Sequence, residues 1–189
     1  MRIPHVTSAP VLGLFAIALA WLALVISSPL IVPNGTLTDL SGVVGGHEND
    51  DQFAPLSSVP RAVYWLGDAE CHQLANRSYF LNDNQMPFCA RDLGIFVGLA
   101  AGFGLMAFFR YKVHPVILLA GLVPIGIDGG LQQVTDYEST NTLRIVTGTV
   151  AGVVLALLFA HFLFIVQEDR EKRRPAPEAE ASGGEPGQG

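Results

Sequence analysis

Long apolar runs alternate with polar segments along the chain. The runs at residues 10–32, 93–109 and 145–166 contain no Lys, Arg, Asp or Glu. A helix of roughly 20 residues crosses about 30 Å of hydrocarbon, because each residue adds about 1.5 Å. The three runs therefore predict three membrane-spanning helices.

A shorter apolar run, residues 113–127, ends at Asp128 and predicts one further span. It is long enough only if the helix continues through Gln132, with Asp128 held inside the protein. Pro115 falls in the first turn and is tolerated there, whereas Pro124 is expected to kink the helix. The expected fold class is an all-α membrane protein with four transmembrane helices and an irregular outer segment between the first and the second.

The same pattern divides the chain into four parts. We expect an N-terminal transmembrane anchor (1–32), an extracytoplasmic segment that carries a Cys-His motif (33–92), a three-helix membrane core (93–167) and a disordered cytoplasmic tail (168–189). The anchor is expected to stay uncleaved, because its apolar run exceeds the roughly 7–15 residues of a signal peptide. The end of the tail lacks aromatic and large aliphatic residues, so it cannot bury enough surface to fold.

Composition and charge narrow the class further. The chain is 50% hydrophobic and only 15% charged, whereas soluble domains carry about a quarter charged residues. The formal net charge of -6 opposes nucleic acid binding. Seven of the eleven Lys and Arg residues fall on one side of the predicted spans. This bias predicts a multi-pass protein of the cell membrane with both termini in the cytoplasm.

Glycines recur at four-residue spacing in two of the predicted spans. Gly94, Gly98 and Gly102 lie in one span, and Gly148 and Gly152 lie in another. Small residues spaced in this way allow two helix backbones to approach closely. Packing within the bundle is the favoured interpretation, and a homo-oligomer formed through these faces is the alternative.

Polar residues gather where the predicted helices meet the outer side. The candidates for chemistry are His72, Arg91, Asp128 and Arg144, and the accompanying polar cluster comprises Gln73, Arg77, Gln132 and Asn141. One interpretation pairs Asp128 with Arg144 in an ion pair between the third and fourth spans. The other has Arg91 and Arg144 bind an anionic head group while Asp128 or His72 acts as acid or base.

The two cysteines, Cys71 and Cys89, both fall on the predicted outer side. Cysteines in an oxidising compartment usually pair, so a disulfide is expected. The alternatives are a zinc site made by Cys71, His72, Cys89 and Asp92, and unpaired thiols. The metal ligands lack the close C-x-x-C spacing of a strong zinc motif. No other cofactor is expected.

Four short motifs follow one another between residues 64 and 166: CHQLANRSYF, PFCARDLGIFVG, PIGIDGGLQQ and STNTLRIVTGTVAG. In this order they resemble a family of small prokaryotic membrane proteins, domain of unknown function 2085. The resemblance implies a shared fold and a shared polar cluster at the outer face, and it implies no activity. Many relatives have a cysteine where this chain has Asp92, so this chain lacks a third thiolate.

Three function classes follow from these observations. The first is an enzyme or binding protein that acts on a lipid or another anionic small molecule at the outer leaflet of the bilayer. The second is a metal-binding or ion-transport component. The third is a structural assembly factor. The sequence leaves open whether the protein is an enzyme.

Overall fold

The computed structural model describes residues 8–109, 111 and 114–173. Its elements, in order, are α1 (Ala9–Ile31), α2 (Asp50–Phe53), α3 (Ser58–Glu70), the 3-10 turn η1 (Ala75–Arg77), β1 (Phe80–Leu81), β2 (Asn84–Gln85), α4 (Ala90–Phe108), α5 (Pro115–Ala120), α6 (Val123–Val134) and α7 (Asn141–Lys172). Four basic residues used to predict the topology lie outside the described residues: Arg2, Arg110, Lys112 and Arg174.

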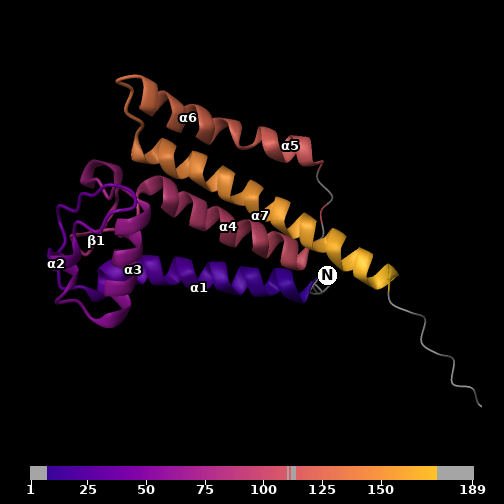
Figure 1. Cartoon of the computed structure of the whole chain (residues 1–189), viewed down its shortest axis with the longest axis horizontal. Coiled ribbons are helices and arrows are strands. Elements are labelled where there is room, and N and C mark those ends of the chain that lie inside the picture. The colour runs from indigo at the N-terminus through magenta and orange to yellow at the C-terminus, as the bar shows by residue number, and fades with distance from the viewer. Residues whose placement is uncertain (1–7, 110, 112–113, 174–189) are drawn as a thin grey trace, which may run out of the picture.

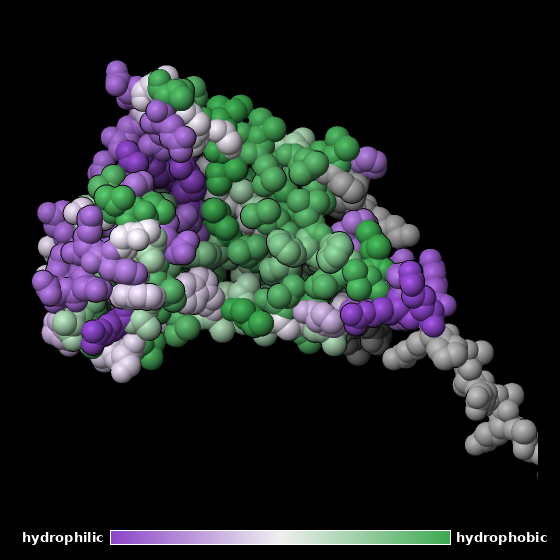
Figure 2. Space-filling view, viewed as in Figure 1, coloured by the Kyte–Doolittle hydropathy of each residue, from purple (hydrophilic) through white to green (hydrophobic). Residues whose placement is uncertain are grey.

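Three long helices form the body of the molecule. Among the described residues, α1, α4 and α7 are long and apolar enough to cross a membrane. They lie side by side, and the start of α1 is at the same end of the bundle as the end of α7 (Figure 1). Hydrophobic side chains cover the middle of the molecule and polar residues gather at its two ends (Figure 2). The helix α7 continues to Lys172, so the first residues of the predicted disordered tail are helical.

The third predicted span is a broken helix, and four continuous transmembrane helices are not found in the described chain. The segments α5 and α6 run roughly in line along α7 (Figure 1), but a turn at Gly121 and Leu122 separates them. Pro124 lies in the first turn of α6, where it cannot donate to Ala120 and its ring disfavours a helical continuation. The amides of Gly121 and Leu122 donate to carbonyl groups three residues earlier, so the break leaves these two groups satisfied.

The glycines of α4 and α7 pack against each other within the chain. A Cβ atom on Gly98 would overlap the carbonyl oxygen of Thr149, and one on Gly152 would overlap that of Ile95. Each helix therefore has a glycine at the point where the backbone of the other helix approaches, because any side chain there would overlap that backbone. The two glycine faces are consequently occupied inside the bundle.

The segment between α1 and α4, residues 32–89, is here called the head region. It was expected to be irregular, but it contains α2, α3, η1 and a hairpin in which Phe80 pairs with Gln85. Its core consists of apolar side chains at the end of α1 and in the head itself: Val32, Leu37, Leu40, Phe53 and Tyr64.

Buried amide side chains organise the head region by bonding to backbone. The Asn84 side chain donates to the carbonyl groups of Pro29 and Val32, which ties the hairpin to the last turn of α1. Gln85 accepts from the amide of Leu40 at 3.0 Å and donates to the carbonyl of Gln73. Since Asn84, Gln85 and Gln73 are fully buried, their hydrogen bonds are needed to offset the loss of water.

We predict that Gly98→Ala destabilises the bundle by about 1–3 kcal/mol, because the added methyl group forces α4 away from α7. Thermal unfolding of the purified protein in detergent measures the effect. The matched control is Gly13→Ala in α1, where a Cβ atom would meet no described atom within 4 Å. That variant should be neutral or slightly stabilising, and equal destabilisation by both variants would contradict the helix contact.

Tyr64 makes the stability of the head region sensitive to alkaline pH. Burial raises the pKa of its phenol, whose hydroxyl donates to the carbonyl of Gln85 at 2.6 Å. The unfolded chain therefore ionises first, and stability should fall as the pH rises above about 10. Tyr64→Phe should cost about 1 kcal/mol at neutral pH and make the alkaline fall shallower. Tyr111→Phe, at a residue that is 50% exposed, should leave both the stability and its pH dependence unchanged in the same unfolding assay.

Candidate functional site

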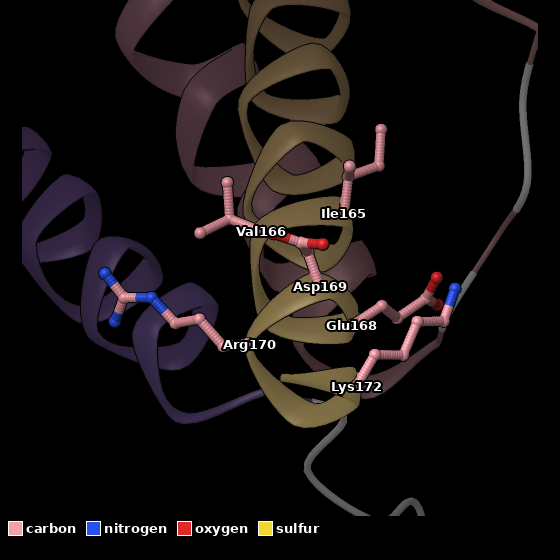
Figure 3. A pocket seen from close by; sticks show the side chains of 6 residues that line it. All are labelled: Ile165, Val166, Glu168, Asp169, Arg170 and Lys172. Atoms are coloured by element: carbon pink, nitrogen blue, oxygen red, sulfur yellow. The ribbon is translucent and has the colours of Figure 1, made fainter. Parts of the chain in front are cut away.

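The two polar ends of the bundle differ in how they are built. At the end of α7, a hollow of about 420 Å³ is lined by six residues of one helix, as Figure 3 shows. Asp169 and Arg173 pair there at 2.9 Å with both side chains more than half exposed, and such surface pairs contribute little. At the opposite end, side chains from several elements converge. This second end is the candidate site.

Arg91 lies at the centre of the candidate site. It belongs to the first turn of α4, where a Cβ atom on Gly148 would overlap its carbonyl oxygen, so the glycine contact brings it against α7. Its Nη2 atom lies 2.6 Å from Asp128 Oδ2 and donates to Gln132 Oε1 at 2.8 Å. Asp128 and Gln132 are four residues apart on α6 and thus share a face. One guanidinium group therefore joins α4 to α6.

The predicted ion pair between Asp128 and Arg144 is wrong. Asp128 is 4% exposed and pairs with Arg91, and its other carboxylate oxygen accepts from the Tyr137 hydroxyl at 3.4 Å. The short connection between α6 and α7 makes their ends neighbours in sequence. The polar face of α6, however, is turned toward α4.

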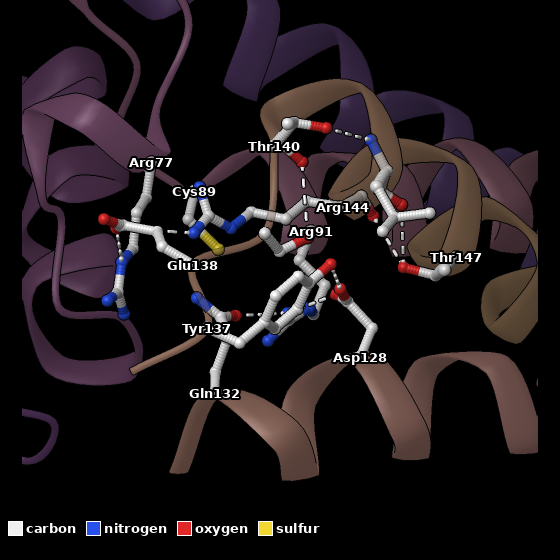
Figure 4. A network of polar contacts seen from close by, with 12 residues as sticks. Arg77, Cys89, Arg91, Asp128, Gln132, Tyr137, Glu138, Thr140, Arg144 and Thr147 are labelled. Atoms are coloured by element: carbon white, nitrogen blue, oxygen red, sulfur yellow. Dashed lines mark hydrogen bonds and ion pairs between the residues drawn. The ribbon is translucent and has the colours of Figure 1, made fainter. Parts of the chain in front are cut away.

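Arg144 instead occupies a buried position at the start of α7, with 2% of its surface exposed. Its Nη1 atom donates to Asn141 Oδ1 at 2.9 Å, and its Nη2 atom lies 3.7 Å from Glu138 Oε1. The same carboxylate oxygen lies 3.3 Å from Arg77 Nε. We call Arg77, Arg91, Asp128, Gln132, Glu138, Asn141 and Arg144 the arginine network (Figure 4).

The arginine network has more hydrogen-bond donors than its own residues can satisfy. Arg91 Nε, Gln132 Nε2 and Arg144 Nη2 are buried and have no hydrogen-bond partner among the described residues. All three are nitrogen donors, and they come from three different helices. Arg91 and Arg144 also lie in first helical turns, where a positive charge is disfavoured by the helix dipole. The site is therefore suited to an anionic acceptor.

An apolar cavity of about 360 Å³ adjoins this network. Most of its lining is aliphatic, and Asp128 and Tyr137 belong both to the cavity wall and to the polar contacts beside it: the lining residues are Val123, Pro124, Ile127, Asp128, Leu131, Tyr137, Leu143 and Thr147. The cavity lies along α6 and the start of α7. The arginine network and the apolar cavity thus meet at the carboxylate of Asp128.

A second group of side chains lies where α3 ends and α4 begins. The Sγ atoms of Cys71 and Cys89 and a carboxylate oxygen of Asp92 all lie within 4.8 Å of one another. Cys89 donates to Asp92 Oδ2 at 3.0 Å. The hydrogen bond between the thiols lowers the pKa of Cys71 and raises that of Cys89. We call these three residues the thiol cluster.

Two expectations about the cysteines need correction. Cys71 and Cys89 are adjacent but are free thiols, so the predicted disulfide is not formed. The alternative zinc site included His72 as a ligand, yet His72 is exposed and its Nδ1 atom lies 3.1 Å from the carbonyl oxygen of Gly42. The backbone between Cys71 and Gln73 is responsible, because it buries those two side chains and directs the residue between them outward. His72 also makes no described contact with the arginine network, so a role there as acid or base finds no support.

The remaining predicted polar residues divide between two places. Gln73 belongs to the interior of the head region, where its side chain donates to the carbonyl of Pro87 at 2.8 Å. Arg77 and Asn141 join the arginine network, and Asn141 also donates to the carbonyl of Ser78 at 3.3 Å. Glu138 and Tyr137 were not identified from the sequence. Both lie in the loop before α7, and their acidic and aromatic character alone does not distinguish them from ordinary loop residues.

The chain is similar to proteins of archaea that have no assigned activity. The family described as "Predicted membrane protein (DUF2085)" matches residues 71–158. Uncharacterized protein MJ1492 of Methanocaldococcus jannaschii is 33% identical over 108 residues, covering 54% of this chain and 67% of the relative. An uncharacterized protein of Methanothermobacter thermautotrophicus is 37% identical over 92 residues, covering 47% and 82%. No solved structure matches. The family match contains both the thiol cluster and the whole arginine network.

We predict that Arg91 and Asp128 are energetically coupled and that Arg144 and Asp128 are not. In a double-mutant cycle with Arg91→Gln and Asp128→Asn, the coupling should be about 1 kcal/mol or more, because the 2.6 Å ion pair is lost only once. The cycle with Arg144→Gln and Asp128→Asn should give less than about 0.5 kcal/mol. Thermal unfolding in detergent supplies both values. Equal coupling in the two cycles would contradict the pairing described here.

Proposed function

The chain belongs to the DUF2085 family of predicted membrane proteins, and we propose that it binds a lipid with an anionic phosphate head group. The head group would occupy the arginine network, and the hydrocarbon part would lie in the adjoining apolar cavity. The observation that carries the proposal is the set of three buried nitrogen donors that have no hydrogen-bond partner among the described residues. A buried donor left unsatisfied costs about 1–3 kcal/mol, and an anion with several oxygens would recover that cost.

The charge balance of the arginine network supports an anionic ligand. Three guanidinium groups face two carboxylates, and one of these, Glu138, is divided between Arg77 and Arg144. The Glu138 side chain is 52% exposed, and the same oxygen also accepts from the Asn76 side chain at 2.8 Å. A phosphate group accepts from several directions and pairs well with the planar donor fork of arginine.

The cavity supports an amphiphile over a free anion. Its aliphatic lining continues from Asp128 along α6, so a ligand held at the arginine network would have apolar surface next to it. Apolar channels with a few polar groups at one end are suited to ligands of the same polarity pattern. The broken helix places this channel beside α7, in the part of the molecule where hydrophobic residues cover the surface (Figure 2).

The proposal also assigns a side of the membrane. The bias of Lys and Arg toward the other ends of the helices favours cytoplasmic termini. Because the start of α1 and the end of α7 lie together (Figure 1), the head region and the arginine network would then face outward. The ligand would come from the outer leaflet.

We predict that the purified protein retains phosphatidylglycerol in preference to phosphatidylcholine, and that Arg144→Gln lowers this retention at least about tenfold. Loss of one buried, charged donor that bonds to the head group lowers the binding free energy by about 1.4 kcal/mol or more, which is a factor of ten in affinity. Native mass spectrometry of protein released from nanodiscs of defined composition measures the retained lipid.

The matched control for this experiment is Arg61→Gln, at an exposed arginine of α3 outside the arginine network. It should retain phosphatidylglycerol like the unaltered protein. Inorganic phosphate should compete only weakly, because it cannot use the apolar cavity. Equal retention of the two lipids would refute the anionic preference, and competition by phosphate at similar affinity would identify a free anion as the ligand.

A further inference from the structure

The thiol cluster combines three candidate ligands, two thiols and one carboxylate, that converge from separate positions in the chain. Cys71 follows the last residue of α3, Cys89 precedes the first residue of α4, and Asp92 lies in the first turn of α4. Cys89 and Asp92 share a helical face because they are three residues apart. Cys71 is 7% exposed and packs with Phe88 and Met86 in the apolar core below the head region. The fold thus holds the three groups together.

The donor set selects a class of metal ion. Two thiolates and a carboxylate suit Zn²⁺, whereas Mg²⁺ and Ca²⁺ prefer oxygen ligands only. In a tetrahedral zinc site, bonds of about 2.0–2.3 Å place neighbouring ligand atoms roughly 3.5–3.8 Å apart. The three ligand atoms here already lie within 4.8 Å of one another, so only small side-chain movements would be needed.

We propose that Cys71, Cys89 and Asp92 bind one Zn²⁺ ion and leave its fourth position open. Three protein ligands with a water or a substrate group in the fourth place are typical of zinc sites that carry out chemistry. Asp92 also lines a cavity of about 320 Å³, together with Trp21, Leu66, Glu70, Phe88 and Phe96. The open position would be reached through this cavity.

The cavity has a defined and mostly apolar wall. Trp21, Phe88 and Phe96 pack edge to face, with ring centroids 5.1–6.0 Å apart. They come from α1, the head region and α4, so the wall is built where all three meet. Glu70 immediately precedes Cys71 and supplies a second carboxylate to the same cavity. The accessible ligand would therefore be small and largely apolar, with one group able to reach the metal.

The other possible metal-binding group is less suitable. His47, Asp50 and Asp68 also lie within 4.8 Å of one another, but the first two are exposed. Both carboxylate oxygens of Asp68 already accept hydrogen bonds from Asn49, at 2.6 and 3.0 Å. His47 stacks on Trp65 with a centroid distance of 4.2 Å. These contacts account for the residues without a metal.

Metal binding at the thiol cluster would release protons. The Cys89 thiol donates a hydrogen bond to Asp92. Zn²⁺ would replace the thiol protons of Cys89 and Cys71, both of which leave to solvent. The loaded site would carry one net negative charge. Cys89 lies beside the guanidinium groups of the arginine network (Figure 4), which offset that charge.

Cobalt substitution of the full-length protein in detergent, under reducing conditions, tests the proposal directly. One equivalent of Co²⁺ should bind and give a near-ultraviolet charge-transfer band from thiolate to cobalt, and Zn²⁺ should displace it. Cys71→Ser and Cys89→Ser should each lower the bound metal from one equivalent to nearly none. Asp92→Asn should keep the band but weaken binding at least about tenfold.

Two control variants make the result specific. His72→Ala and His47→Ala should bind Co²⁺ as the unaltered protein does, because neither residue belongs to the thiol cluster. Asp92→Cys should strengthen the charge-transfer band by adding a third thiolate, and this holds even if the serine variants fold poorly. Absence of the band in the folded, unaltered protein would overturn the proposal. So would loss of binding in His47→Ala, or cysteines that react with an alkylating agent only after reduction.

Discussion

The close approach of α4 and α7 is the contact on which the rest of the structure depends. It exists because Gly98 and Gly152 lack side chains where the two backbones meet. The same contact ends at Gly148, which lies against the carbonyl oxygen of Arg91. A packing motif in the apolar part of the bundle therefore fixes the position of a cation at its polar end. Without this approach, Arg91 and Arg144 would not lie near one another.

The head region extends this arrangement by a different kind of interaction. Its short helices and its hairpin enclose a small apolar core, and buried amide side chains bonded to backbone groups join its segments to one another. Asn84 and Gln85 each bond to chain segments more than forty residues away. The end of α3 and the start of α4 are joined by Gln73, whose side chain donates to the carbonyl of Pro87, and this bond helps to bring the residues of the thiol cluster together. The two candidate sites thus depend on one framework, although they share no residue.

The sequence predicted the elements governed by hydropathy well. The apolar runs agree with α1 and α4 to within about three residues, since the length of an apolar run directly reflects the need to avoid water, whereas α7 extends beyond its run at both ends. Pro124 correctly indicated a disturbed helix. A proline can produce either a kink or a complete break, so the residue type alone does not distinguish the two. The head region was missed because its buried Asn84 and Gln85 have the polarity of an ordinary loop. Only their tertiary partners distinguish them.

The sequence predicted which polar residues lie together at the outer ends of the helices, but it did not predict which of them form ion pairs. Polar residues at helix ends revealed the depth at which Arg91, Asp128 and Arg144 lie. Which of them pair depends on the rotation of α6 about its axis, and a single sequence does not contain that angle. Likewise, the positive φ of 44° at Gln73 belongs to a turn whose course decides which neighbouring side chains are buried. The residues next to His72 include no glycine or proline that would indicate a turn.

The break between α5 and α6 makes this part of the molecule easier to bend than the three long helices. A continuous helix resists bending along its whole length, whereas two short helices joined by a turn concentrate compliance at that turn. The described polar contacts between α6 and α4 lie in the middle and the last turn of α6, where Arg91 contacts Asp128 and Gln132. The helix α6 can therefore bend at the turn before its first residue, and the contacts of Arg91 with Asp128 and Gln132 hold it against α4. Sideways displacement of α6 would widen the apolar cavity toward the hydrocarbon while α1, α4 and α7 keep their packing. The rate of ligand exchange would then be limited by breaking the contacts of Arg91 with α6 and not by the stability of the bundle.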